Sequence, residues 1–421
     1  MRLNSRAVII LILSLMLAGT LLGSLAIQGK RNEGKPEETI VVNEPDVKDQ
    51  DDDVIPESFL GFFDDGYGID EDVKKLITGY MDDYYRSIYT LEKADTSKYF
   101  DNELASAISD SSIRLLVETR KLHDFDLRMS GAHYDLEVTD CYQEGDLYHV
   151  HVLENDHFYF RFLGGIESVV YDIENDFTIR KTEEGYLITD LDKEQGYYLC
   201  FHDGCETVQE VEDTYRYTYS QLKDMNSYNE DVLKAKAESM PYIPSKTYMK
   251  EYDRNAAVSY LEKYCHERNS EWFNYSDVGG NCQNYASQAM YAGGIPMDFY
   301  GDEQWKCFKD PDSYDPEVDE SETAAGRSRS WVNVGYFYDY ARYNSGSGLV
   351  AETGVNIHYA QPGDIIIVGN GTLAHTVMVS KVVDGHILVD SNSIDMKDFP
   401  IEAYTYTNVI LVKILGYNEY Q

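Results

Sequence analysis

The chain has 421 residues, of which 36 are basic and 75 are acidic, giving a formal net charge of −39. A field of this sign repels phosphate backbones and anionic membrane surfaces, which excludes a general nucleic-acid-binding role. Apolar residues make up 43 % and aromatic residues 13 % of the chain, so a wholly disordered chain is also excluded. The length favours two folded units.

An apolar, uncharged run covers residues 7–27 and follows Arg2 and Arg6. It predicts a signal peptide with a cleavage site at residues 24–26, or an uncleaved signal anchor. Both interpretations place the rest of the chain outside the cytosol, either secreted or anchored in the membrane. Residues 28–58 are polar, acidic and interrupted by proline, so we expect a disordered linker there.

Residues 59–200 are expected to form an α+β domain of unknown role. Apolar residues recur at helical spacing over residues 68–93, with Asp70 as the expected N-cap, and a second helical stretch covers residues 101–120. From residue 134 the period changes to two, which predicts an antiparallel meander. The order of elements resembles the cone-shaped folds of the NTF2-like class.

His149 and His151 lie on the same face of a predicted strand in this domain. With no third ligand in view, they are better interpreted as solvent-facing residues of a half-buried strand than as a metal site. The chain contains neither a CxxC pair nor an HExxH motif, so we predict no metal and no cofactor.

Six cysteines are few for a secreted chain of this length, which excludes a disulfide scaffold. Their spacing leaves two pairings open. Cys200 could close a small loop with Cys205, and Cys265 could pair with Cys307.

A helical connector is expected over residues 201–247, followed by the last domain at residues 248–421. Within that domain, "GGNCQNYASQAMYAGG" (residues 279–294) predicts a helix that starts at Cys282 and ends at two glycines. The free N–H groups and the positive dipole end of a helix start favour a thiolate over a thiol. Cys282 is therefore a candidate nucleophile.

A candidate base stands at His375, the first residue in the second of three predicted strands, at residues 364–368, 374–383 and 386–391. If the strands pair tightly around the turn at residues 384–385, Asp390 and Asn392 share the sheet face of His375. Either side chain could orient the imidazole. A perfect two-residue turn favours Asn392, and a bulge would bring Asp390 closer.

Four motifs occur in order in this last domain: "YDRNAAVSYLEKYC", "GGNCQNYASQAMYAGGIPM", "SWVNVGYFYDY" and "GDIII…AHTVMV". Together they resemble the Putative amidase domain family, within the papain-like group that includes CHAP and NlpC-type cell-wall amidases. The resemblance implies a catalytic helix packed on an antiparallel sheet. It also implies Cys282 as nucleophile, His375 as general base and Asp390 at the third polar position, with Asn392 still open.

The resemblance further implies an extracellular cysteine amidohydrolase acting on a peptide or peptidoglycan-type substrate. We expect the backbone N–H of Cys282 to bind the oxyanion, with Asn281 or Gln283 assisting and Trp331 walling the cleft. The family more often has Asp and Thr at the two positions that flank the cysteine. An inactive binding or sensor protein, or a transpeptidase or deamidase using the same dyad, are the alternatives. The oligomeric state is left open.

Overall fold

The computed structural model describes residues 59–63, 66–123, 126–234, 241–276, 279–300, 304–307, 327–369, 373–404 and 408–420. The predicted signal segment (residues 7–27) and the predicted linker (residues 28–58) lie outside this range. In the described part of the chain, no helix combines the length and the apolar character that a membrane crossing requires.

The N-terminal part of the chain is built from helices packed on a meander, as the sequence predicts. Its helices are α2 (Glu71–Thr90), α3 (Glu103–Arg120), α4 (Gly196–His202) and α5 (Val208–Lys234). Its strands are β1 (Phe59–Phe63), β2 (Met129–Glu144), β3 (Leu147–Phe160), β4 (Ser168–Thr182) and β5 (Gly185–Lys193). The expected cap is confirmed, because the side chain of Asp70 accepts a hydrogen bond from the N–H of Asp72 at 2.9 Å.

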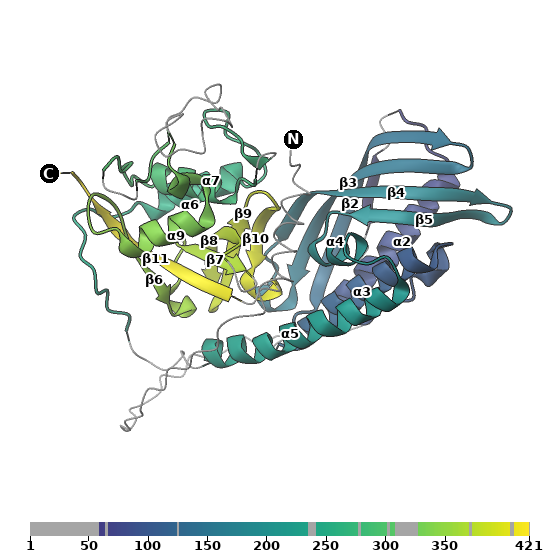
Figure 1. Cartoon of the computed structure of the whole chain (residues 1–421), viewed down its shortest axis with the longest axis horizontal. Coiled ribbons are helices and arrows are strands. Elements are labelled where there is room, and N and C mark those ends of the chain that lie inside the picture. The colour runs from purple at the N-terminus through teal and green to yellow at the C-terminus, as the bar shows by residue number, and fades with distance from the viewer. Residues whose placement is uncertain are drawn as a thin grey trace.

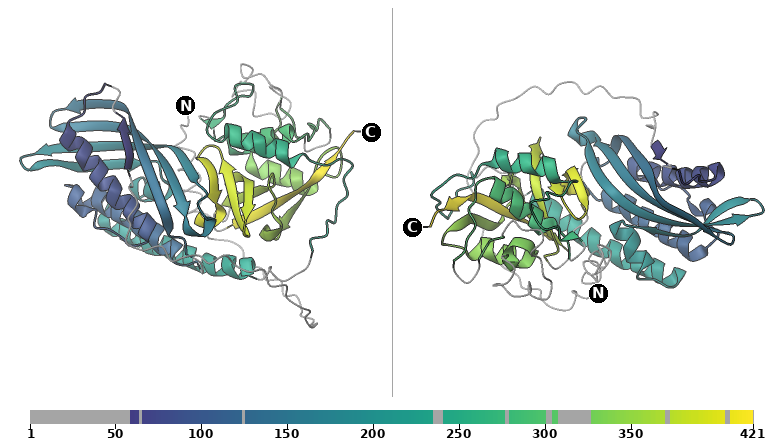
Figure 2. Two further views of the ribbon diagram at one scale, coloured as in Figure 1. Left: turned by 180° about the vertical axis from the view of Figure 1, so that it is seen from behind. Right: turned by 90° about the horizontal axis from the view of Figure 1, so that it is seen from above.

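One face of the meander is covered by helices, and alternation along the strands explains which side chains it buries. Val150, Val152 and Phe177 are almost fully buried and belong to one apolar cluster with the inner face of α2. Figure 2 shows α2, α3 and α5 running along this face of the curved sheet. Residues at the alternate positions, such as His149 and His151, point to the opposite face and are only half-buried.

The C-terminal part combines four helices with six strands among the described residues. The helices are α6 (Arg254–Tyr264), α7 (Cys282–Ala292), α8 (Arg329–Val332) and α9 (Val334–Tyr343). The strands are β6 (Gly348–Val355), β7 (Ile365–Gly369), β8 (His375–Val383), β9 (His386–Ser391), β10 (Asp395–Pro400) and β11 (Asn408–Asn418). Short 3-10 turns occur at Ser97–Tyr99, Arg161–Leu163, Ile357–Tyr359 and Ile401–Ala403.

The motif at residues 330–340 is divided between two helices at Asn333. The side chain of Asn333 accepts hydrogen bonds from the N–H groups of Gly335 and Tyr336, which makes it the N-cap of α9. This cap separates α9 from α8.

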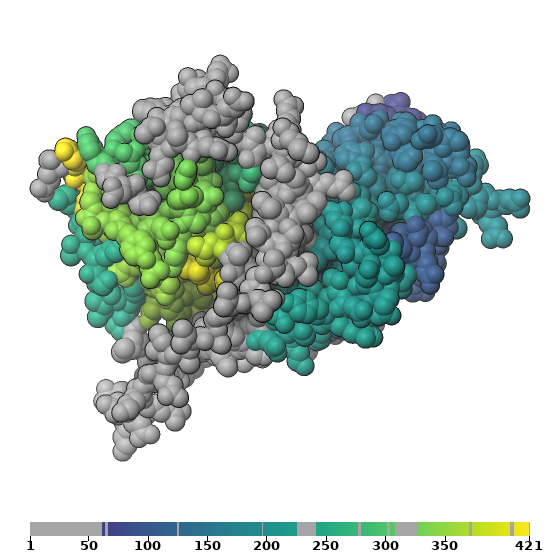
Figure 3. All heavy atoms as spheres, viewed as in Figure 1, coloured from purple at the N-terminus to yellow at the C-terminus, as the bar shows by residue number. Residues whose placement is uncertain are grey.

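The two parts share one mostly antiparallel sheet, in the order β1-β2-β3-β4-β10-β9-β8-β7-β11-β6, with β5 pairing β4. The α+β class is therefore confirmed. The connection is the β4–β10 pair, in which Met396 lies opposite Val170, and Ser168 Oγ donates to the carbonyl of Asp398 at 2.7 Å. In Figures 1 and 3 the N-terminal residues gather at one end of the long axis and the C-terminal residues at the other.

Apolar side chains reinforce this junction. Phe399 of β10 is 6 % exposed and belongs to the core cluster of the N-terminal part. Its ring makes edge contacts with Phe160 at 5.9 Å and Phe158 at 6.3 Å between centroids. A residue of the C-terminal part thus completes the core of the N-terminal part.

None of the six cysteines forms a disulfide. Neither of the two pairings that the spacing left open is formed. The thiols of Cys200 and Cys265 are instead covered by protein, and burial raises the pKa of Cys200 to about 11 and that of Cys265 to about 12.

The junction predicts a large effect of Phe399→Ala on the stability of the whole chain. Losing a buried ring that two other rings contact should lower the free energy of unfolding by about 3 kcal/mol, measured by urea denaturation. Phe63→Ala is the matched control, since the Phe63 side chain is 52 % exposed and its loss should cost less than about 1 kcal/mol. Equal effects of the two substitutions would contradict the role given to Phe399.

Candidate functional site

Helix α7 begins at Cys282, as the sequence predicts. Asn281 occupies the N-cap position, and the helix packs against α6 and β8. The nine residues from Cys282 to Met290 are all buried, so the helix is enclosed by protein on every side. Cys282 itself is 8 % exposed, and its thiol lies at the edge of the core.

Three backbone N–H groups near the sulfur of Cys282 favour the thiolate. They belong to Thr376, Gln283 and Cys282 itself. Burial acts more strongly in the opposite direction and raises the pKa of the thiol. The site therefore contains donors directed at the position of a negative charge, but it holds the free thiol protonated.

His375 is the first residue of β8. It directly precedes Thr376, whose N–H favours the Cys282 thiolate. The imidazole is 4 % exposed, and burial lowers its pKa to about 4, which leaves it uncharged near neutral pH. Its Nε2 is buried and has no hydrogen-bond partner among the residues that the structure describes. No hydrogen bond joins the described side chains of His375 and Cys282 in this state.

The predicted sheet register is confirmed at the turn and changes farther along the strands. Val383 lies opposite His386 as expected, but a bulge between Val379 and Lys381 shifts the pairing, so Met378 lies opposite Asp390. Met378 belongs to the apolar cluster that contains Cys282. Asp390 therefore faces the helix side of the sheet.

His375 lies on the other face. It pairs with Val368, and Val368 belongs to the cluster on the far side of the sheet from α7. The prediction that Asp390 and Asn392 share the face of His375 is wrong, because the extra residue of the bulge reverses the alternation beyond it. The catalytic roles proposed for these residues stay predictions.

Asp390 is fully buried and incompletely paired. Its Oδ1 accepts a hydrogen bond from the N–H of Asp398 at 2.8 Å, and its Oδ2 has no partner among the described residues. Burial, followed by the nearby carboxylate of Asp398, raises the pKa of Asp390 to about 7. The neutral acid is therefore populated at neutral pH.

Asn392 holds the start of α7 in place. Its Oδ1 accepts from Asn281 Nδ2 at 2.6 Å, and its own Nδ2 donates to the carbonyls of Tyr264 and Cys265. The remaining oxygen of Asn281 accepts from Tyr275 N–H and from Asn284 Nδ2. These bonds connect the last turn of α6, the end of β9 and the N-cap of α7.

Gln283 ties the same helix start to β8. Its Oε1 accepts from Thr376 Oγ1 at 2.8 Å, and its Nε2 donates to Ser287 Oγ at 3.2 Å. One side-chain N–H of Gln283 and one of Asn281 are thus engaged, and the assisting role expected for these residues stays a prediction. The backbone N–H groups around Cys282 are further donors for an oxyanion.

Trp331 lies behind α7 in a fully buried position. Its Nε1 donates to Asn284 Oδ1 at 2.9 Å, and its ring contacts those of Trp305 and Trp272 at 4.5 Å and 5.3 Å between centroids. It supports the helix from the core and does not line an open cleft.

Thr376 is the site residue that the sequence analysis missed. Two of its groups reach α7, the N–H toward the sulfur and the hydroxyl toward Gln283. The sequence contained a signal for this role, because Thr376 is a polar residue that directly follows the candidate base at the start of an otherwise apolar strand.

Metal chemistry has no support among the described residues, where no group of three or more His, Cys, Asp or Glu side chains is placed to share an ion. His149 and His151, predicted to face solvent, lie together on the open face of β3.

Comparison with known proteins places the site in context. Residues 251–415 match the model of the family described as "Putative amidase domain". The uncharacterized protein YhbB of Bacillus subtilis (strain 168) is 30% identical over 151 residues, covering 35% of this chain and 43% of YhbB. The uncharacterized protein YjcM of the same organism is 26% identical over 178 residues, covering 40% of this chain and 37% of YjcM. The chain thus spans less than half the length of either relative.

Among solved structures, that of a putative aromatic ring hydroxylase from Novosphingobium aromaticivorans shares 15% sequence identity and gives a TM-score of 0.19. It covers 29% of this chain and 89% of that chain. A likeness of this size carries no argument about fold or activity.

The raised pKa of Asp390 predicts how its removal changes stability with pH. The folded protein binds a proton at Asp390 up to about pH 7, while an unfolded aspartate loses it near pH 4, so this contribution to stability is lost as the pH rises through that window. Asp390→Asn does not titrate. Its free energy of unfolding relative to wild type should therefore rise by about 2–4 kcal/mol between pH 4 and pH 8. Urea denaturation across this range measures the difference, and Asp384→Asn at an exposed turn is the control.

Asn392→Ala should destabilise the start of α7. Asn281 Nδ2 and two backbone carbonyls would lose their partners inside the protein, which costs about 1–3 kcal/mol in the free energy of unfolding. Thermal or urea unfolding provides the measurement. Asn274→Ala is the control, because Asn274 is exposed and, among the described residues, its side chain bonds only to Ser276. A wild-type stability for Asn392→Ala would show that these bonds do not hold the helix.

Proposed function

We propose that residues 251–415, which match the model of the family described as "Putative amidase domain", form a cysteine-dependent amide hydrolase with Cys282 as nucleophile and His375 as general base. The observation that carries the proposal is the position of Cys282 at the start of α7, where the backbone N–H groups of Cys282, Gln283 and Thr376 favour the thiolate. A buried cysteine with a purely structural role does not need such donors.

In the proposed reaction, the His375 side chain first turns from the far face of the sheet toward Cys282. It then takes the proton of the Cys282 thiol as the sulfur attacks the carbonyl carbon of the amide. The carbonyl oxygen becomes an oxyanion, and backbone N–H groups of the helix start bind it. The tetrahedral intermediate collapses, the C–N bond breaks, and His375 returns its proton to the leaving amine. Water, deprotonated by His375, then hydrolyses the thioester and regenerates the thiol.

The resting ionisation states support this order of events. Burial raises the pKa of Cys282 and lowers that of His375 to about 4, so both groups are neutral near pH 7. A neutral imidazole is the form that accepts a proton. In this proposal the proton moves during attack on the substrate, and the ion pair is not preformed.

The finer fold assignments are part of the same proposal. A nucleophile at the start of a helix, packed on an antiparallel sheet that carries the histidine, supports the papain-like assignment of the C-terminal part. Helices along one face of a curved meander support the NTF2-like assignment of the N-terminal part. Asp390 or Asn392 as the third catalytic group would require a rearrangement of the bulged strand.

We further propose an extracytoplasmic location, with a peptide or peptidoglycan stem as substrate. The apolar run at residues 7–27 supports the location, and the resemblance to cell-wall amidases supports the substrate. A net charge of −39 repels anionic wall polymers, so adsorption would depend on other contacts. Transpeptidation or deamidation would use the same Cys282 and His375 with another acceptor.

A second candidate function is an inactive surface binding or sensor protein. The observation that favours it is the absence of a hydrogen bond between the described side chains of Cys282 and His375, together with the raised pKa of the thiol. A catalytic comparison separates the two candidates.

We expect purified residues 28–421 to cleave muropeptides, with products identified by mass spectrometry. Cys282→Ala and His375→Ala should each lower the rate by at least about 10³-fold, since nucleophile and base act as a unit. Cys141→Ser is the control, because Cys141 lies on β2, outside any disulfide and far from α7 in the sequence. Equal product in wild type and Cys282→Ala would eliminate the hydrolase and leave the sensor.

A further inference from the structure

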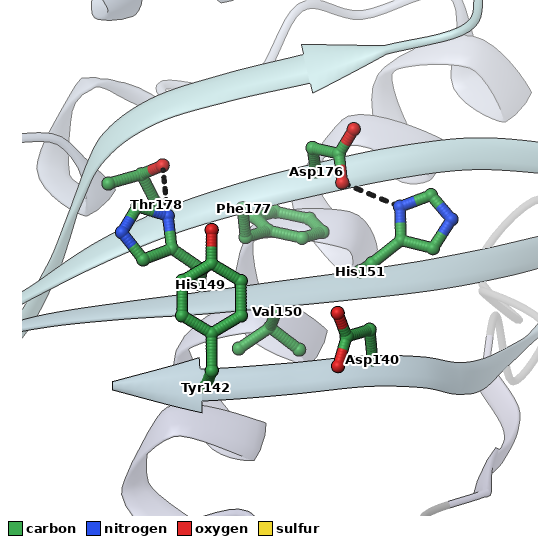
Figure 4. A pocket seen from close by; sticks show the side chains of 8 residues that line it. All are labelled: Asp140, Tyr142, His149, Val150, His151, Asp176, Phe177 and Thr178. Carbon is green, nitrogen blue, oxygen red and sulfur yellow. Dashed lines mark hydrogen bonds and ion pairs between the residues drawn. The ribbon is translucent and has the colours of Figure 1, made fainter. Parts of the chain in front are cut away.

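A groove of about 470 Å³ lies on the helix-free face of β2, β3 and β4, in the N-terminal part (Figure 4). It is lined by Asp140, Tyr142, His149, Val150, His151, Asp176, Phe177 and Thr178. The side chains of Val150 and Phe177 point to the opposite, helix-covered face, so their backbone forms the floor of the groove, and the polar side chains stand around it. The size is that of a small-molecule site.

The polar side chains form two rows across the three strands. In the first row His151 lies directly opposite Asp140 on β2 and opposite Asp176 on β4. A bulge in β2 between Val138 and Asp140 sets this alignment. Directly paired residues point to the same face, so the histidine stands between two carboxylates.

The second row presents an aromatic surface beside these carboxylates. Here Tyr142 lies opposite His149, which lies opposite Thr178. The Tyr142 and His149 rings stack at 4.7 Å with 17° between their planes. Figure 4 shows the Tyr142 ring standing next to the His149 imidazole at one end of the groove.

Hydrogen bonds fix both imidazoles. Nδ1 of His151 lies 2.5 Å from Oδ1 of Asp176, and Nδ1 of His149 lies 3.3 Å from Oγ1 of Thr178. Asp140 is exposed, and none of the residues that the structure describes forms an ion pair with it. The groove therefore contains one carboxylate that is held by a histidine and one that is open to a ligand.

Negative charge predominates around the groove. In the next row of the same face, Leu153 lies between Glu137 and Glu174, which adds two carboxylates. On the other side stands Arg180, whose guanidinium already contacts Asp101 at 3.1 Å and Asp146 at 3.7 Å. A cation that enters the groove would therefore meet carboxylates and an aromatic face. Arg180 does not compete with it, because the guanidinium is already paired with Asp101 and Asp146.

We propose that this groove is a binding site for a small organic ammonium ion. The ammonium group pairs with the Asp140 carboxylate beside the His151–Asp176 pair, and the remainder of the ligand packs on the stacked rings of Tyr142 and His149. A bare metal ion fits less well, since no described group of three or more ligating side chains converges there. The proposal is independent of the chemistry assigned to Cys282.

The test uses residues 28–421 with benzylamine, which is an ammonium ion at pH 8, and with benzyl alcohol as the neutral probe of the same shape. Calorimetric titration at low ionic strength should detect benzylamine and not benzyl alcohol. Asp140→Asn and Asp176→Asn should each weaken binding at least about fivefold, and Tyr142→Ala about threefold or more.

Glu144→Gln is the matched control, because it removes one carboxylate from the end of the same strand outside the groove. Its affinity should stay within about twofold of wild type. Equal binding of benzyl alcohol would show a non-ionic site, and an equal loss in Glu144→Gln would show diffuse attraction to an acidic surface. Each of these two results would overturn the proposal. So would tight binding of Zn²⁺ that excludes benzylamine, or no binding of benzylamine.

Discussion

The hydrogen bond between Thr376 and Gln283 is the contact on which the candidate site depends. It joins the first turn of α7 to the second residue of β8, and these two segments lie far apart in the sequence. Both side chains are buried, so water does not compete for this hydrogen bond. The bond also holds the Thr376 N–H near the Cys282 sulfur. Asn281 and Asn392 secure the same helix start from the other side.

Burial, more than charge pairing, sets the ionisation of this region. The pKa of His375 is lowered to about 4 and that of Asp390 is raised to about 7, in both cases mainly because the charged form is excluded from water. Their effects on stability oppose each other. As the pH rises from 4 to about 6.5, the folded state gains stability through the neutral imidazole and loses it through the ionising carboxyl. The site therefore tolerates two buried titratable groups with a small net pH dependence.

Local signals in the sequence were sufficient for most helices and hairpins. The cap at Asp70, the helix start at Cys282 and the turn between Val383 and His386 follow from residue type and period alone, and the structure confirms them. The bulge near Ser380 could not be predicted this way. Ser380 Oγ donates to Asp398 Oδ1 at 2.8 Å, so the shift depends on a strand that the period did not reveal. Long-range pairing, such as that of β4 with β10, has no local signature.

The β4–β10 pair also sets a requirement for proteins in which a domain similar to residues 251–415 has a different N-terminal partner. Residues 251–415 contain β10, and in this chain the free edge of β10 is paired by β4, which lies outside the matched segment. An uncovered edge strand recruits other strands and promotes aggregation. A homologous domain attached to a different N-terminal partner must therefore protect this edge by other means, such as a shorter strand, a proline or a covering loop. In this chain the N-terminal part thus covers the edge strand of the C-terminal part.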